Sequence, residues 1–210
     1  MSVDASMAGV ADQDAPAGAE SGGPAPAHIV VAYGFWIFLL SDIIMFSALF
    51  AAYAVLSGQT AGGPAGRQLF DLRNAGIETM CLLFSSYACG LGALALRRGR
   101  MPGFYLACVG TFALGATFLA LEIAEFARLV AMGAGPSRSA FLSAFFSLVG
   151  LHGVHVSAGL ISLAFMVAQV AARGPRQFVL RRFHCFSLFW HALDIIWVAL
   201  LTLVYLMGVG

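Results

Sequence analysis

The chain has 210 residues, of which 60% are hydrophobic and 10% are charged, and its mean hydropathy is +0.89. Soluble domains carry about a quarter charged residues, so this composition excludes a soluble globule and indicates an integral membrane protein. The formal net charge is only +1, which excludes the strongly basic surface that nucleic-acid binding requires.

Residues 1–28 are rich in Ala, Gly, Pro, Asp and Ser and contain no Lys or Arg. A secretory signal peptide begins with basic residues and an early apolar core, so we predict a disordered tail instead. Five apolar segments follow, each long enough to span a bilayer as a helix of about 20 residues. The sequence therefore predicts an all-α polytopic membrane protein with one domain, residues 29–208. Its helices are expected at about 29–56, 75–96, 103–127, 140–172 and 184–207.

The loops differ in their arginine content, which predicts the orientation of the chain. The loops after the second and fourth segments carry seven arginines: Arg97, Arg98, Arg100, Arg173, Arg176, Arg181 and Arg182. The loops after the first and third carry four: Arg67, Arg73, Arg128 and Arg138. Because arginine-rich loops stay in the cytoplasm, we expect the N-terminus and its tail inside and the C-terminus outside.

Ionisable residues inside the apolar segments are the candidate functional residues, because they are costly in hydrocarbon. His152 and His155 are three residues apart and therefore share one helix face. A rise of about 1.5 Å per residue puts the histidines and the two aspartates towards the middle of the bilayer and the three glutamates towards its outer side. The full set is Asp42, Glu78, Glu122, Glu125, His152, His155, His191 and Asp194.

Three interpretations of these residues are open. A metal site is suggested by the H-x-x-H, H-x-x-D and E-x-x-E patterns on three helices, but the glutamates are displaced in depth and an E-x-x-H pair is absent. A proton relay would use Asp42. We favour the third interpretation, in which histidines and carboxylates pair across helices, because a polar group left unpaired in lipid costs more than the roughly 0.6–2 kcal/mol that such a bond contributes.

On this third interpretation, His152 and His155 pair with His191 and Asp194 and fasten the fourth helix to the fifth. The aromatic run 183–190 and Trp197 are expected to pack against lipid or another subunit. Tyr205 is expected in an aromatic belt at the membrane surface.

Four segments resemble subunit III of the haem–copper terminal oxidases. The resemblance covers residues of about 29 to 208, and a chain of five helices is similar to the bo-type (cytochrome o) ubiquinol oxidase branch of that family, whereas mitochondrial-type subunits III have seven. The segments are GFWIFLLSDIIMFS (34–47), LEIAEF (121–126), LHGVHVSAGL (151–160) and FWHALDIIW (189–197).

The resemblance implies an accessory subunit without a catalytic, cofactor-binding or metal-binding residue of its own. Haem and copper are expected in the partner large subunit, subunit I, and assembly is expected with subunits I and II and a small subunit IV in the bacterial cytoplasmic membrane. The complex would oxidise ubiquinol, reduce oxygen to water and pump protons, while this chain binds phospholipid and supports sustained turnover and proton uptake. Asp42 falls where many cytochrome c oxidases have Glu, so the carbodiimide reactivity of that Glu should not be assumed here.

Three rival interpretations remain at this point. The chain could be subunit III of a cytochrome c oxidase. It could be a stand-alone membrane metalloenzyme that uses His152, His155, His191 and Asp194. It could also be a small transporter that uses Asp42, although the absence of an inverted repeat counts against this.

Overall fold

The computed structural model describes residues 27–60, 71–174 and 177–206. Their regular structure consists of α1 (Ala27–Leu56), α3 (Leu72–Arg97), α4 (Met101–Ala131), α5 (Ala140–Arg173) and α6 (Gln177–Leu200), which continues into the π-helical turn η1 (Leu201–Leu206). Within these ranges five helices are long and apolar enough to cross a membrane, so the predicted all-α, five-helix fold is confirmed. The predicted tail lies outside the described residues except for positions 27 and 28, which belong to α1.

Two helices are longer than their apolar runs predicted. α6 begins at Gln177 instead of 184, because Arg181 and Arg182 interrupt the apolar run without interrupting a helix. For the same reason α4 continues through Arg128 to Ala131 instead of ending at 127, and Gly133, with φ of 75°, follows its end. A helix stops where the backbone conformation changes, which is often several residues beyond the last apolar side chain.

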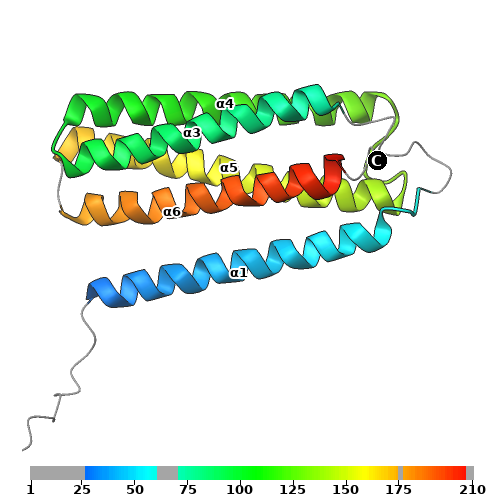
Figure 1. The fold of residues 1–210 in the computed structure, drawn as a ribbon, viewed down its shortest axis with the longest axis horizontal. Helices are drawn as coiled ribbons and strands as arrows, with labels where there is room; N and C mark the ends of the chain where they lie inside the picture. The colour runs from blue at the N-terminus through cyan, green and yellow to red at the C-terminus, as the bar shows by residue number, and fades with distance from the viewer. Residues whose placement is uncertain (1–26, 61–70, 175–176, 207–210) are drawn as a thin grey trace, which may run out of the picture.

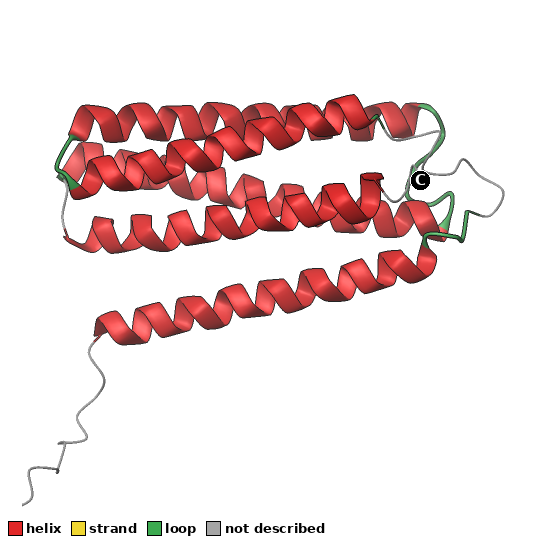
Figure 2. Cartoon of the chain, viewed as in Figure 1, coloured by secondary structure: helices red, strands yellow, loops and turns green. Residues whose placement is uncertain are grey.

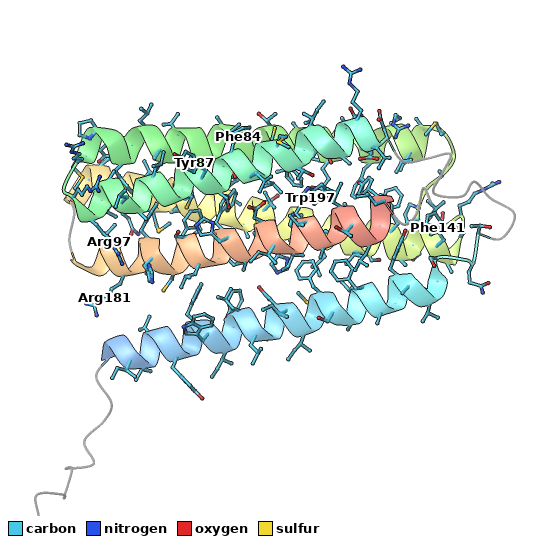
Figure 3. All side chains as sticks on the ribbon, in the orientation of Figure 1. Phe84, Tyr87, Arg97, Phe141, Arg181 and Trp197 are labelled. Carbon is cyan, nitrogen blue, oxygen red and sulfur yellow. The ribbon has the colours of Figure 1, made fainter. Side chains whose placement is uncertain are left out.

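Helices α3, α4, α5 and α6 lie side by side as a bundle, and α1 lies along one side of it against α5 and α6 (Figure 1). Short loops join α3 to α4 and α4 to α5 at the ends of the bundle (Figure 2). Arg97 and Arg181 lie at one end of the bundle and Phe141 at the other (Figure 3). The bundle therefore places two of the arginine-bearing helix ends on one side, and the assignment of that side to the cytoplasm stays a prediction.

The buried core is built on an aromatic stripe of α6. Its members recur at intervals of three, four and seven residues, which places them on one helix face, and all are buried: Phe183, Phe186, Trp190 and Trp197. Our expectation that this stretch faces lipid or another subunit was therefore wrong for these four side chains. Indole rings are wide and flat, and the bundle accommodates that of Trp190 by placing two glycines opposite it.

Trp190 shows how close that accommodation is. A Cβ atom added to Gly115 of α4 would lie 3.0 Å from Cζ2 of Trp190, and one added to Gly159 of α5 would lie 2.7 Å from its Cζ3. The indole N–H donates a hydrogen bond of 2.9 Å to Oγ of Ser85 on α3. One side chain of α6 thus contacts the three other helices of the bundle, and small residues at these positions allow the approach.

Candidate functional site: buried polar groups of the helix bundle

Asp42 and His155 join α1 to the bundle. Nε2 of His155 lies 3.7 Å from Oδ2 of Asp42, and Nδ1 of His155 lies 2.8 Å from the carbonyl oxygen of Leu151. A carbonyl only accepts hydrogen bonds, so Nδ1 carries a hydrogen and Nε2 is the nitrogen that faces the carboxyl group. The 3.7 Å separation is longer than a hydrogen bond, so this is a close contact between the imidazole of α5 and the carboxyl group of α1.

His152 packs as an aromatic ring at the centre of the structure. It is fully buried, and its ring centroid lies 6.3 Å from that of Phe46 on α1, 5.7 Å from Phe118 on α4 and 5.2 Å from Trp197 on α6. Neither ring nitrogen has a hydrogen-bond partner among the described residues. His152 of α5 therefore makes edge-to-face contacts with Phe46 and Phe118 and a tilted contact with Trp197, which together connect four helices.

His191 contacts α3 instead of the two histidines of α5. Nδ1 of His191 lies 3.0 Å from Oγ of Ser86 on α3, and Oδ1 of Asp194 is buried without a hydrogen-bond partner in the described part of the chain. The predicted pairing of His152 and His155 with His191 and Asp194 is therefore not found. The reason is rotation: Trp190 occupies the interior face of α6, and the next residue is turned by about 100° from it.

The three glutamates form a separate cluster. Glu78 of α3 and Glu122 and Glu125 of α4 are 1%, 3% and 4% exposed. The hydroxyl of Tyr205 donates to Oε2 of Glu125 at 3.3 Å, and Nη2 of Arg128 lies 3.7 Å from its Oε1.

Glu122 nevertheless lies closer to the histidines than its depth suggested. A Cβ atom on Gly153, the residue after His152, would lie 2.7 Å from Oε1 of Glu122. This follows from the longer α4: its end at Ala131 puts Glu122 nine residues inside the helix (131 − 122), whereas the predicted end at 127 left five. The glutamate cluster therefore reaches deeper into the bundle than predicted.

Comparison with known proteins identifies the family. Residues 23–209 match the family described as cytochrome c oxidase subunit III. The chain belongs to this family. A Pseudomonas aeruginosa protein named cytochrome bo(3) ubiquinol oxidase subunit 3 is 50% identical over 177 residues, which are 84% of this chain and 84% of the relative. The Bacillus subtilis protein named quinol oxidase subunit 3 is 42% identical, over 84% of this chain and 87% of the relative.

A third relative carries a different name. The protein of Bacillus sp. PS3 named cytochrome c oxidase subunit 3 is 39% identical over 175 residues, which are 83% of this chain and 84% of the relative. The family resemblance stated from the sequence is confirmed, and the relatives cited include both quinol oxidase and cytochrome c oxidase subunits.

No group of three or more His, Cys, Asp or Glu side chains in the described ranges is arranged to hold a metal ion. The metal interpretation of the histidines and acids therefore gains no support from the geometry of this subunit III family member. Among its polar side chains, His191 instead contacts Ser86 on another helix, and the buried His152 packs in contact with aromatic rings.

Several of these partners were missed at the level of the sequence. Ser85 accepts from Trp190, and Thr79 accepts from Trp197 over 3.0 Å. The spacing in the sequence could have indicated these contacts. The two tryptophans are seven residues apart and the two hydroxyl residues are six apart, so the two pairs can face each other across two antiparallel helices. Tyr205, expected at the membrane surface, is 1% exposed, because η1 turns it towards Glu125.

A cavity of about 1000 Å³ lies between α1, α5 and α6 in this subunit. Apolar side chains such as Phe38, Phe165 and Phe189 line most of it, and Arg181 and Arg182 line it at one end. Nη1 of Arg182 donates to Oε1 of Gln169 on α5 at 3.3 Å. The cavity therefore combines a long apolar wall with two guanidinium groups.

Proposed function

We propose that the chain is the accessory subunit III of a proton-pumping haem–copper quinol oxidase in the bacterial cytoplasmic membrane. The observation that carries this proposal is the 50% identity to a relative named ubiquinol oxidase subunit 3, which extends over 177 residues. In such a complex, subunit I holds the haem and copper, ubiquinol is oxidised and oxygen is reduced to water. This chain supplies no catalytic centre and assembles with subunits I and II and a small subunit IV.

The outer surface of α1 supports a role in assembly. Of its described side chains, only Leu39, Asp42, Phe46 and Tyr53 are buried within the chain. Large apolar side chains on its other faces are exposed, including Trp36 at 60% and Ile44 at 62%. A partner subunit or lipid must cover these faces in the membrane, and the helix is long enough to present them across the whole bilayer.

The cavity between α1, α5 and α6 supports phospholipid binding. Acyl chains fit its apolar wall, and the phosphate of a headgroup fits the two guanidinium groups, because arginine recognises phosphate through bidentate hydrogen bonds. The arginine-rich end of the bundle then faces the cytoplasm, as the loop charges predict. In this orientation the Asp42–His155 pair lies within α1 and α5, above the cytoplasmic headgroup layer, where it supports proton uptake and sustained turnover of subunit I.

Co-purification tests the proposal. The chain is tagged, extracted from its own membranes in mild detergent and captured by the tag. Co-elution of a haem-containing large subunit with ubiquinol oxidase activity is expected, and elution of the chain without haem protein contradicts it. The electron donor distinguishes a quinol oxidase from a cytochrome c oxidase. Activity with reduced cytochrome c and none with ubiquinol would make the chain part of a cytochrome c oxidase.

Metal analysis of the isolated chain separates the metalloenzyme rival. Stoichiometric iron, copper or zinc that is retained by the purified chain and lost in His152→Ala contradicts an accessory role. For the lipid site, Arg181→Ala and Arg182→Ala together are expected to lower the amount of anionic phospholipid that co-purifies with the chain. The pair Arg97→Ala and Arg98→Ala, at the same end of the bundle but outside the cavity, serves as the matched control.

A further inference from the structure

The three glutamates define a carboxyl cluster, Glu78, Glu122 and Glu125, that the accessory role leaves without a function. The cluster is enclosed by α3, α4 and η1, and the backbone of Gly153 on α5 covers Glu122. The three side chains are close enough for their charges to interact with one another and with the hydroxyl of Tyr205. Three carboxyl groups thus share one buried site.

Hydrogen-bond donors are distributed unequally over this cluster. Glu125 receives the Tyr205 hydroxyl at Oε2 and has the guanidinium of Arg128 3.7 Å from Oε1. Both oxygens of Glu78, Oε2 of Glu122 and Oε1 of Glu125 are buried and have no hydrogen-bond partner in the described part of the chain, so Glu125 alone receives a hydrogen bond in addition to the nearby guanidinium. An ionised carboxylate can only accept hydrogen bonds, whereas a protonated carboxyl supplies one O–H donor. Protons on Glu78 and Glu122 would therefore provide donors where the side chains around them supply none.

The charges around the cluster lead to the same assignment. The groups that face it are Asp71 and Cys81 from the α3 side, Arg128 of α4 and Tyr205 of η1, while α5 presents backbone. With all three glutamates ionised, the cluster itself would hold three negative charges, with the exposed carboxyl of Asp71 nearby, against the positive charge of Arg128. Like charges in a low-dielectric site cannot all ionise, and two protons bring the cluster and Arg128 to neutrality.

We infer that the carboxyl cluster is a proton-binding site in which Glu78 and Glu122 carry protons at neutral pH and Glu125 is the ionised member. The site titrates as one unit, because each carboxyl changes the field at the other two. Binding of the two protons allows α3, α4 and η1 to pack together without uncompensated charge between them. Loss of these protons places repelling carboxylates between the helices and loosens η1, so the docking of the C-terminal turn depends on pH.

This inference concerns the chain itself and does not depend on its association with an oxidase. The chain has four glutamates, namely Glu20 in the N-terminal region and the three of the cluster. Infrared spectra of the purified full-length chain in lipid nanodiscs, grown with ¹³C-labelled glutamate, distinguish glutamate from aspartate by the isotope shift. At neutral pH, isotope-shifted carboxylic-acid C=O absorption equivalent to two glutamates is expected.

Variants assign the two protons. Glu78→Gln and Glu122→Gln are each expected to remove the carboxylic-acid absorption of one glutamate. Glu20→Gln is the matched control, because it makes the same substitution at a glutamate that is not a member of the cluster, and it should leave that absorption unchanged. The labelled wild-type spectrum decides the inference even where a variant fails to fold. Wild-type chain without isotope-shifted carboxylic-acid absorption at neutral pH overturns it, as does a folded Glu78→Gln or Glu122→Gln chain that retains the wild-type amount.

Thermal unfolding gives an independent readout. A folded state that binds more protons than the unfolded chain loses stability as the pH rises. The wild-type unfolding midpoint should therefore fall between neutral and alkaline pH, and it should fall less in the double variant Glu78→Gln/Glu122→Gln, because the amide resembles the protonated acid in shape and charge. An equal fall in both chains contradicts the inference.

Discussion

Substitution of Gly159 by alanine is expected to push against Trp190 and destabilise the bundle. The added Cβ would lie 2.7 Å from Cζ3 and 3.0 Å from Cε3 of the indole, whereas carbon atoms pack at about 3.5–4.0 Å. The ring cannot withdraw freely, because it lies against Gly115 and its N–H is bonded to Ser85. Such overpacking costs about 1–3 kcal/mol.

Alanine has about 1 kcal/mol more helix propensity than glycine, so the effect must be measured against a second glycine of the same helix. Gly150 is the matched control: its added Cβ would lie 3.6 Å from Cε2 of Phe126, an ordinary contact. Both variants gain the same propensity, and only Gly159→Ala meets the indole. We therefore expect Gly159→Ala to be less stable than Gly150→Ala by about 1–3 kcal/mol.

The assay is reversible denaturation of the purified chain in mixed micelles, followed by circular dichroism. Trp190→Phe, which removes the ring atoms that Gly159→Ala meets, should reduce the cost of the alanine in a double-mutant cycle. Equal stability of the two alanine variants, or strict additivity in the cycle, would refute the reasoning that Trp190 is held between Gly115 and Gly159.

Two further substitutions test the polar contacts between helices. His155→Leu leaves the carboxyl of Asp42 without its partner and should lower the free energy of unfolding by about 1–3 kcal/mol. The double variant His155→Leu/Asp42→Leu should recover part of that loss. A double variant whose loss equals the sum of the two single losses would contradict the pairing. Trp197→Phe removes the N–H donated to Thr79 and should lower stability by about 1–3 kcal/mol in the same denaturation assay. Trp36→Phe, at an exposed position, should leave stability unchanged. Equal losses in the two variants would show that the buried contacts of Trp197 do not account for its effect on stability.

The number and type of the helices could be predicted because hydropathy and length are properties of each segment alone. The position of each polar residue along its helix could be predicted in part, because the rise per residue is constant. The facing direction of each side chain could not, since a helix surrounded by lipid and protein is apolar on all sides and shows no polar face to mark solvent. His191 illustrates this: one step from Trp190 in the sequence turned it from the expected partners on α5 to Ser86 on α3.

Hydrogen-bond partners on different helices could be predicted from the sequence only where two helices carry their polar residues at similar spacings. The spacing of Trp190 and Trp197 against Ser85 and Thr79 is such a case. The contact of Asp42 with His155 had no such signal, because a single residue on α1 has no interval to match. Pairing by chemistry alone then favoured the neighbouring helix, and the structure places the pair between helices far apart in the chain.

The distance in sequence between Asp42 and His155 has a consequence for biosynthesis. The two residues are 113 positions apart (155 − 42), which at about 5–20 residues per second of synthesis separates their appearance by roughly 6–23 s. During that interval α1 is in the membrane with its carboxyl unpaired, at an insertion penalty of about 2.5–3.5 kcal/mol for an acid near a helix centre. The mean hydropathy of 2.2 in the most apolar window of α1 offsets this penalty, so the helix stays inserted before His155 is synthesised.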